Sequence, residues 1–235
     1  MFNFSFDDLK RFASSKARKW TVLLGSSCRY RRCGFQKTGI FVRIDKIIAN
    51  SKYGLNGCRG SDIAIIQLAR DIHPYEIAKP ACIAPPQYKI TDFLFAFGRG
   101  ENPLAIKVQN FEKLIRLQTV HLAQTKCEKN YPKDVICTSE VFQSTCKGDS
   151  GGGLMHVSNR RSYVVGITSF GMQCQLTMEN IEKGHARHSH PGAYTDVRLY
   201  VGWICKMIGL CVHSSPMTQE AKANSFDKPH IFYPV

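Results

Sequence analysis

The stretch that decides the fold reads Cys146-Lys147-Gly148-Asp149-Ser150-Gly151-Gly152-Gly153. A serine hydroxyl is a weak nucleophile at neutral pH. It attacks a carbonyl only when a tight turn holds it beside a general base and backbone amides face the developing oxyanion. Glycine permits such a turn and lets a carbonyl approach the backbone closely. The stretch therefore predicts Ser150 as a nucleophile with the amides of Gly148 and Ser150 as oxyanion donors, and a plain glycine-rich turn is the alternative.

Further motifs surround this stretch in a fixed order. Residues 61–68 read Ser-Asp-Ile-Ala-Ile-Ile-Gln-Leu, an acid that leads into an apolar strand. Residues 165–171 read Val-Gly-Ile-Thr-Ser-Phe-Gly, residues 191–197 read Pro-Gly-Ala-Tyr-Thr-Asp-Val, and residues 200–204 read Tyr-Val-Gly-Trp-Ile. Several motifs in one order are far more specific than any one of them.

Together these motifs resemble the chymotrypsin/trypsin-like serine proteases over roughly residues 20 to 210. The resemblance implies an all-β, chymotrypsin-like fold of two β-barrels with a C-terminal helix. It also implies peptide-bond hydrolysis through an acyl-enzyme on Ser150, with Asp62 orienting the histidine base and the Gly148 amide in the oxyanion hole. No cofactor or metal is expected.

The histidine base has no counterpart in this sequence. In the resembled family it precedes the strand that Trp20–Gly25 resembles, whereas every histidine here follows Asp62. The eight histidines are His73, His121, His156, His185, His188, His190, His213 and His230. We expect each to be an ordinary surface or core residue, and the chain as it stands to be inactive. The spacing of His185, His188 and His190 could in principle hold a metal, but a solvated loop is favoured.

The N-terminal part resembles an incomplete first barrel. The three strands expected there, around Trp20–Gly25, Phe41–Ala49 and Ile63–Leu68, make half of a six-stranded barrel, which suggests an N-terminally truncated member of the family. The family's new amino terminus, whose ammonium pairs with the acid beside the nucleophile, has no counterpart either. We therefore expect Asp149 to lack a partner and either to turn towards solvent or to hold a proton.

Four regions follow from these comparisons: a first-barrel remnant over 1–70, a linker over 71–92, the second barrel with its closing helix over 93–211, and a flexible tail over 212–235. No apolar run is long enough to cross a bilayer, and residues 1–8 do not read as a signal peptide.

Ten cysteines point to disulfides and a secreted protein rather than to metal ligation. The resemblance implies a bond between Cys146 and Cys174, which bracket the specificity pocket, and another between Cys127 and Cys137. It leaves six cysteines unassigned, and Cys205 could bond with Cys211 or elsewhere. The six are Cys28, Cys33, Cys58, Cys82, Cys205 and Cys211.

The resemblance also assigns the substrate pocket. Its floor is Ser144, its two wall positions are Gly171 and Gly192, and Ser169 and Phe170 belong to the strand that pairs with substrate. An uncharged floor between two glycines predicts a preference for aromatic or large aliphatic side chains before the scissile bond. The insertion over 175–190 borders the same pocket, and its Glu179 and Glu182 are the alternative source of a counter-charge for basic side chains.

The net charge of +14, from 32 Lys and Arg against 18 Asp and Glu, attracts acidic partners. The basic residues form no nucleic-acid motif, so a solvated surface of a monomer that acts on proteins or peptides is favoured. The second hypothesis is a non-catalytic homologue that binds acidic partners through this surface.

Overall fold

The computed structural model describes residues 20–27, 32–33, 36–37, 39–55, 60–73, 79–91, 93–102, 117–141, 143–171, 174, 179, 182–183, 190–212 and 229–232. The elements are β1 (Thr21–Leu24), β2 (Arg32–Cys33), β3 (Gln36–Lys37), β4 (Ile40–Asn50), α2 (Lys52–Leu55), β5 (Ala64–Leu68), β6 (Cys82–Ile83), β7 (Leu94–Gly98), β8 (Gln118–Thr125), β9 (Val135–Ser139), β10 (Gly153–Ser158), β11 (Arg161–Phe170), β12 (Gly192–Asp196), the 3-10 helix η3 (Val197–Tyr200), α6 (Val201–Ile208) and β13 (Pro229–Phe232).

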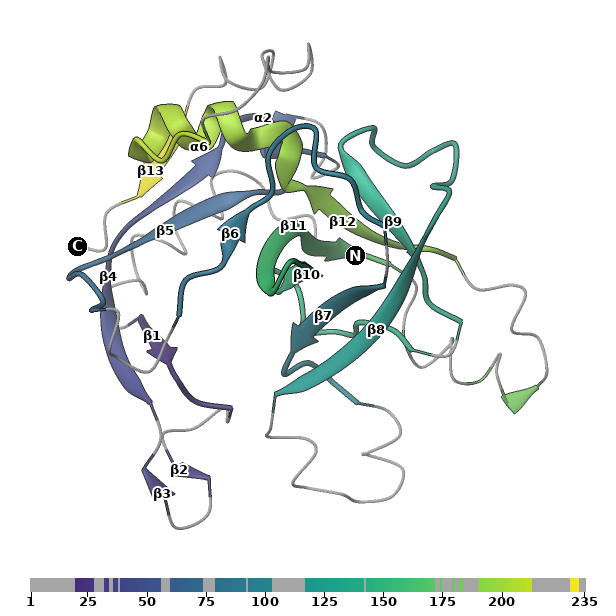
Figure 1. Cartoon of the computed structure of the whole chain (residues 1–235), viewed down its shortest axis with the longest axis horizontal. Coiled ribbons are helices and arrows are strands. Elements are labelled where there is room, and N and C mark those ends of the chain that lie inside the picture. Colours follow the sequence, from purple (N-terminus) through teal and green to yellow (C-terminus); the bar gives the residue numbers. More distant parts are fainter. Residues whose placement is uncertain are drawn as a thin grey trace.

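Six strands of the C-terminal half close into an antiparallel barrel, which confirms the all-β fold with one complete barrel (Figure 1). The order is β7–β8–β9–β12–β11–β10, and β10 returns to pair with β7. Buried apolar side chains fill its interior, so the barrel has a packed core. The core residues are Ala84, Leu94, Ala96, Leu122, Ile136, Leu154, Val165 and Tyr194.

The N-terminal half is an open sheet built around β4. This strand has 11 residues, many of them β-branched, and it carries β1 along its first part and β5 along the rest. The three strands predicted there are therefore present. Residues 229–232, which lie within the predicted flexible tail, form β13 and pair with the end of β4. For these four residues the structure differs from the prediction of a flexible tail. They include the β-formers Ile231 and Phe232, and they pair with an edge of β4 that would otherwise be open.

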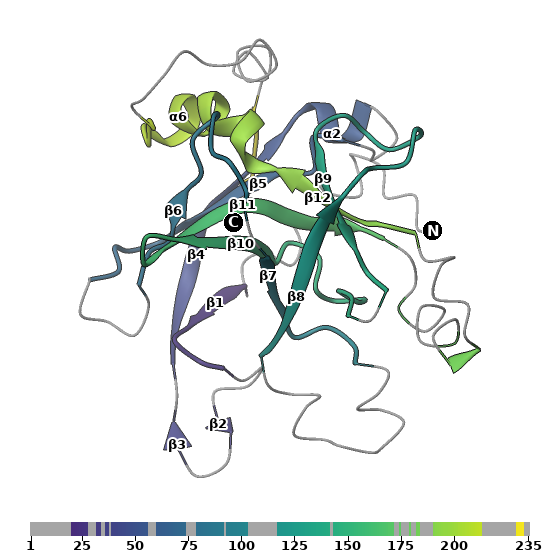
Figure 2. The same cartoon turned by 45° about the vertical axis from the view of Figure 1, so that its right-hand side comes forward.

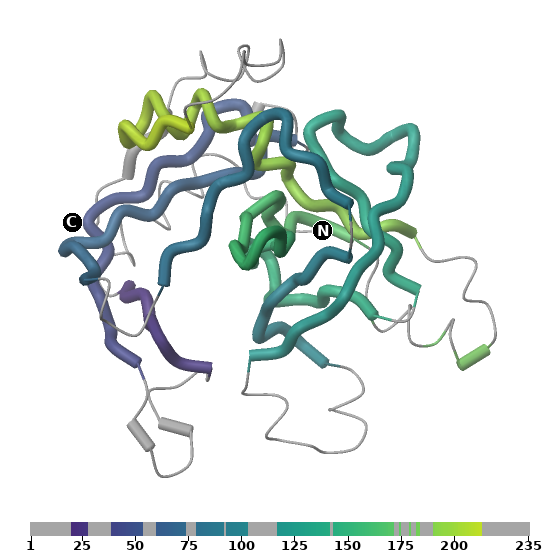
Figure 3. Tube along the Cα trace, viewed as in Figure 1, coloured from purple at the N-terminus to yellow at the C-terminus, as the bar shows by residue number. Residues whose placement is uncertain are grey.

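The predicted closing helix is α6, which follows η3 directly and packs against the N-terminal sheet (Figure 2). Its C-cap is Gly209 in the left-handed conformation, whose N–H bonds the carbonyl of Cys205 at 2.8 Å. Figure 3 shows α6 lying over the strands of the first half while its chain comes directly from the barrel. The second core, which joins the two halves, contains Ile48, Ile63, Val197, Tyr200, Trp203 and Ile204.

Three disulfides are present among the described residues. Cys127 bonds Cys137, and Cys146 bonds Cys174, the two pairings that the resemblance implies. Cys205 bonds Cys211, one of the alternatives that the sequence left open. Cys82 is exposed and forms no disulfide. It lies in the predicted linker, in the short strand β6, which pairs in parallel with β11. None of the described helices is long and apolar enough to cross a membrane.

Candidate active site

Ser150 is exposed on a tight turn that leads from the loop after β9 into β10. Gly148 and Gly151 on either side adopt φ values of 98° and 81°, which favour glycine. The turn is bound to β11, since the N–H of Gly151 bonds the carbonyl of Thr168 at 2.9 Å and the N–H of Thr168 bonds the carbonyl of Gly152 at 2.8 Å. These hydrogen bonds fix the backbone on both sides of Ser150 and present its side chain to solvent.

Asp149 points into the protein from this turn. Its Oδ1 accepts the N–H of Gly100 at 2.6 Å, and its Oδ2 accepts the N–H of Cys146 at 2.9 Å. A side chain on Gly98 or Gly100 would overlap the carboxyl group, so both glycines make room for it. The expectation that Asp149 lacks a partner is therefore wrong, because two backbone amides hold its carboxyl group inside the structure.

The peptide between Lys147 and Gly148 has a defined orientation. The carbonyl of Lys147 accepts the N–H of Glu101 at 2.8 Å. A trans peptide directs its N–H opposite to its carbonyl, and the described residues contain no cis peptide. The Gly148 amide therefore points away from Glu101 and remains available as a donor near Ser150.

Asp62 lies between the two halves of the molecule. Its Oδ2 accepts the hydroxyl of Ser169 at 2.6 Å, and its backbone carbonyl accepts the hydroxyl of Thr195 at 2.8 Å. Burial raises the pKa of the Asp62 carboxyl, while the hydrogen bond from Ser169 opposes that rise. Asp62 thus has a desolvated carboxyl group, and hydrogen bonds from β11 and β12 of the second barrel hold the residue in place.

The residue before Asp62 strengthens this connection. Ser61 has a φ of 54°, and its N–H donates to Oδ2 of Asp134 at 2.6 Å. The hydroxyl of Tyr200 donates to the same oxygen at 2.6 Å. The start of β5 is therefore anchored to the loop before β9 and to η3, which fixes where Asp62 can lie.

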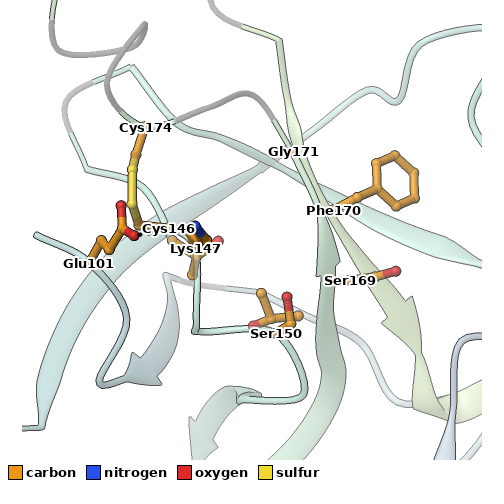
Figure 4. Close-up of a pocket in the computed structure, with 10 residues that line it drawn as sticks. Glu101, Cys146, Lys147, Ser150, Ser169, Phe170, Gly171 and Cys174 are labelled. Carbon is orange, nitrogen blue, oxygen red and sulfur yellow. Dashed lines mark ion pairs between the residues drawn. A yellow bond between two sulfur atoms is a disulfide. The ribbon is translucent and has the colours of Figure 1, made fainter. Parts of the chain in front are cut away.

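A pocket of about 560 Å³ opens beside Ser150. Figure 4 shows Ser150 on its turn, Ser169 to Gly171 on the neighbouring strand, and the disulfide of Cys146 and Cys174 along one side. The lining residues are Glu101, Thr145, Cys146, Lys147, Ser150, Thr168, Ser169, Phe170, Gly171 and Cys174. The predicted substrate residues Ser169, Phe170 and Gly171 thus share a pocket with the predicted nucleophile. Ser144 and Gly192 are not among its lining residues.

Glu140 was not identified from the sequence, and its carboxyl group lies against two of the predicted pocket positions, Gly171 and Gly192. Its side chain is buried, and its carboxyl lies between Gly171 and Gly192. Oε2 is 3.3 Å from the place that a Cβ on Gly171 would take, and Oε1 would overlap a Cβ on Gly192. The space that the two glycines leave open is thus filled by an acid. The signal that could have found it is the presence of an acid between Cys137 and Cys146, in the segment that leads to the pocket floor.

The histidines that the structure describes have surroundings other than the pocket. His156 is buried in β10 against the hydroxyl of Tyr88, and its Nδ1 lies 2.7 Å from that oxygen. His121 packs edge-to-face against Phe95, and no described histidine lines the pocket. His185, His188 and His213 lie outside the described residues, as does most of the insertion over 175–190. The described residues contain no cluster that could hold a metal ion.

Comparison with protein families gives a match that spans most of the chain. The family model described as Trypsin matches residues 13–204, a range that contains Asp62, Glu140, Ser150 and the pocket.

Proposed function

This chain belongs to the trypsin family, and on that basis we propose that its chemistry is peptide-bond hydrolysis through an acyl-enzyme on Ser150. Enzymes of this family act on proteins or peptides as serine endopeptidases. The observation that carries the proposal is the shared fixation of Ser150 and Asp62 by neighbouring residues of β11, Thr168 and Ser169. In this assignment Ser150 attacks, Asp62 orients the base, and the amides of Gly148 and Ser150 bind the oxyanion.

We further propose that the chain by itself is inactive, because no histidine among the described residues lines the pocket beside Ser150. Without a base the serine hydroxyl keeps its proton, so the remaining groups supply only a small part of the catalysis.

The test is labelling of Ser150 by a fluorophosphonate, followed by mass spectrometry. We expect no labelling of the purified chain and measurable labelling when free imidazole is added as a base. The Ser150→Ala variant should show none in either condition, and Asp62→Asn should reduce the imidazole-dependent labelling. Stoichiometric labelling without imidazole would show that another group activates the serine. No labelling at any imidazole concentration would contradict the assignment of Ser150.

We propose that the protein is secreted, because the three disulfides match the expectation from its cysteine content. The preference for aromatic or large aliphatic side chains was predicted from Ser144, Gly171 and Gly192 alone. It stays a prediction, and it does not take account of the carboxyl of Glu140, which lies against both glycines.

A further inference from the structure

The strand β13 occupies an edge of the N-terminal sheet next to the part that presents Asp62. It pairs with residues 47–50 at the end of β4, close to α6 (Figure 1). The strand β5 pairs with the same part of β4, because each residue from Ile47 to Ala49 has a partner in both strands. The two strands therefore lie on opposite edges of β4. Among the residues that the structure describes, only β13 pairs with this stretch on the edge away from β5.

The sequence of the segment suits a short edge strand. Residues 229–234 read Pro-His-Ile-Phe-Tyr-Pro, so strand-forming residues stand between two prolines. Proline has no N–H to donate, and a sheet accepts it at the first residue of a strand or on an edge. Pro229 is the first residue of β13 and pairs with Asn50. The segment therefore has the composition of a single strand added to the edge of β4.

The backbone of β4 shows which residues of β13 turn their N–H groups towards it. The N–H of Asn50 donates to the carbonyl of Ile63 at 3.1 Å, on the side of β5. In an antiparallel ladder, successive residues turn their N–H and C=O groups to opposite edges. Ala49 therefore turns these groups towards β13, where His230 is its partner. The N–H of His230 faces β4, whereas the N–H of Ile231 faces away from it.

Asn50 also links this edge of the sheet to Asp62. Because its N–H binds the carbonyl of Ile63, β4 restrains the residue that directly follows the acid. The N–H of Ile63 donates in turn to the carbonyl of Ser61 at 2.9 Å, so Asp62 lies at the centre of a three-residue turn. Asn50 is fully buried and Ile63 is buried in the second core. A shift of Asn50 must therefore move one end of the turn that carries the Asp62 carboxyl.

The second barrel holds the other end of the same turn. The hydroxyls of Ser169 and Thr195 bind Asp62, and Asp134 binds the N–H of Ser61. These groups come from or adjoin a closed barrel in which every strand has two neighbours. On the side of Ile63 the support is the open sheet, where β13 is the second neighbour of residues 47–50. The position of the acid therefore depends most on β13 where the sheet is least supported.

We propose that β13 is a positioning segment of the active site. By pairing with the end of β4 it fixes Asn50 and Ile63, and through them the carboxyl of Asp62. The inference rests on the proposed function, and it adds a role for residues that follow the closing helix in the sequence. Loss of the pairing should weaken the imidazole-dependent reaction of Ser150 and leave the barrel intact.

The test compares three variants of the full chain. His230→Pro removes the N–H that faces β4, His230→Ala keeps that N–H, and Ile231→Pro removes an N–H that faces away. Fluorophosphonate labelling of Ser150 in the presence of imidazole should be about 10-fold slower in His230→Pro than in the unmodified chain. The two controls should label within about twofold of the unmodified chain. An equal loss in Ile231→Pro and His230→Pro would overturn the proposal, because the effect would not come from the pairing with β4.

Amide hydrogen exchange, followed by mass spectrometry, shows where the loss of pairing acts. In His230→Pro, residues 47–50 and 63–66 should exchange faster, while β10 and β11 should exchange as in the unmodified chain. Faster exchange throughout the barrel would show a general loss of stability and would overturn the local role of β13. Unchanged exchange at residues 47–50 would overturn it as well.

A double-mutant cycle separates the positioning of Asp62 from every other effect of the variant. If β13 acts through Asp62, adding His230→Pro to Asp62→Asn should slow the labelling by less than about twofold. A further loss of about 10-fold in that background would mean that β13 does not act through the acid, and the proposal would be wrong.

The failures of the two proposals can be told apart. If the unmodified chain is labelled at no imidazole concentration, the proposed function fails and the positioning role fails with it, whatever the exchange at residues 47–50. If the unmodified chain is labelled and His230→Pro is labelled at the same rate, the positioning role is wrong and the protease assignment stands.

Discussion

The hydroxyl of Ser169 donates a 2.6 Å hydrogen bond to Oδ2 of Asp62, across a separation of 107 residues in the sequence. This bond joins the N-terminal sheet to the closed barrel at the predicted active site. It holds the carboxyl of Asp62 in place by a side chain of β11.

Replacing Ser169 by alanine should release the Asp62 carboxyl. The hydrogen bond lowers the pKa of Asp62 while burial raises it, so its loss should raise this pKa further. The measurement is a titration of carboxyl carbon shifts by nuclear magnetic resonance. Ser139→Ala, at an exposed position at the end of β9, is the control and should leave the pKa of Asp62 unchanged. An unchanged value in Ser169→Ala would mean that the serine does not restrain the acid.

Replacing Gly98 by alanine should destabilise the turn that carries Ser150. The new methyl group would overlap the Asp149 carboxyl, which must then move and lose its backbone donors. We expect a loss of about 1–3 kcal/mol in the free energy of unfolding, measured in urea. Gly153→Ala is the control, because its Cβ would meet only the Met155 sulfur at 3.5 Å. Equal stability of the two variants would contradict the close packing of Asp149.

The pocket disulfide should stabilise the fold more than the smaller one. Cys146 and Cys174 are 28 residues apart, against 10 for Cys127 and Cys137. Chain-entropy arguments give losses of roughly 3.6 and 2.7 kcal/mol when each pair is replaced by serine. Only loss of the first pair should also reduce the imidazole-dependent labelling of Ser150, since both its cysteines line the pocket beside that residue. Unfolding in urea and fluorophosphonate labelling with imidazole test the two parts separately.

Glu140→Gln should become more stable relative to the unmodified chain as pH rises. The folded-state pKa of Glu140 is raised, so the folded form holds more protons than the unfolded form above 4.5. The stabilising contribution of Glu140 is complete below its unfolded pKa and is lost as pH rises through the folded pKa. The glutamine variant has no such loss. Urea unfolding from about pH 4 to 8 measures the difference, and a difference that does not change with pH would contradict a desolvated carboxyl.

The sequence was sufficient to predict the barrel half and the place of Ser150. The motif around Ser150 has glycines at left-handed positions, which local chemistry requires, and the order of the surrounding motifs resembles the family closely enough to imply the barrel. Trp203 and Tyr200 likewise marked the closing helix and the segment that leads into it.

The pocket could not be predicted in the same way. Its assumed floor came from the position of Ser144 relative to Ser150. The carboxyl of Glu140 lies against Gly171 and Gly192 because it accepts the hydroxyl of Tyr194, a contact that the sequence does not show. The partners of Asp149 were missed for a similar reason. Backbone amides carry no signature in the sequence, so only the fold shows that Gly100 and Cys146 place theirs beside the carboxyl.

The contrast between the closed barrel and the open β4 sheet has a consequence for how the molecule opens. Every strand of the barrel has two neighbours, so its amides should exchange with solvent only when the whole barrel unfolds. The β4 sheet depends on its core with Trp203 and Ile204, and it can open locally when that contact loosens. Because Asp62 precedes β5 in that sheet, the acid of the site belongs to the part that opens first, while Ser150 stays with the part that opens last.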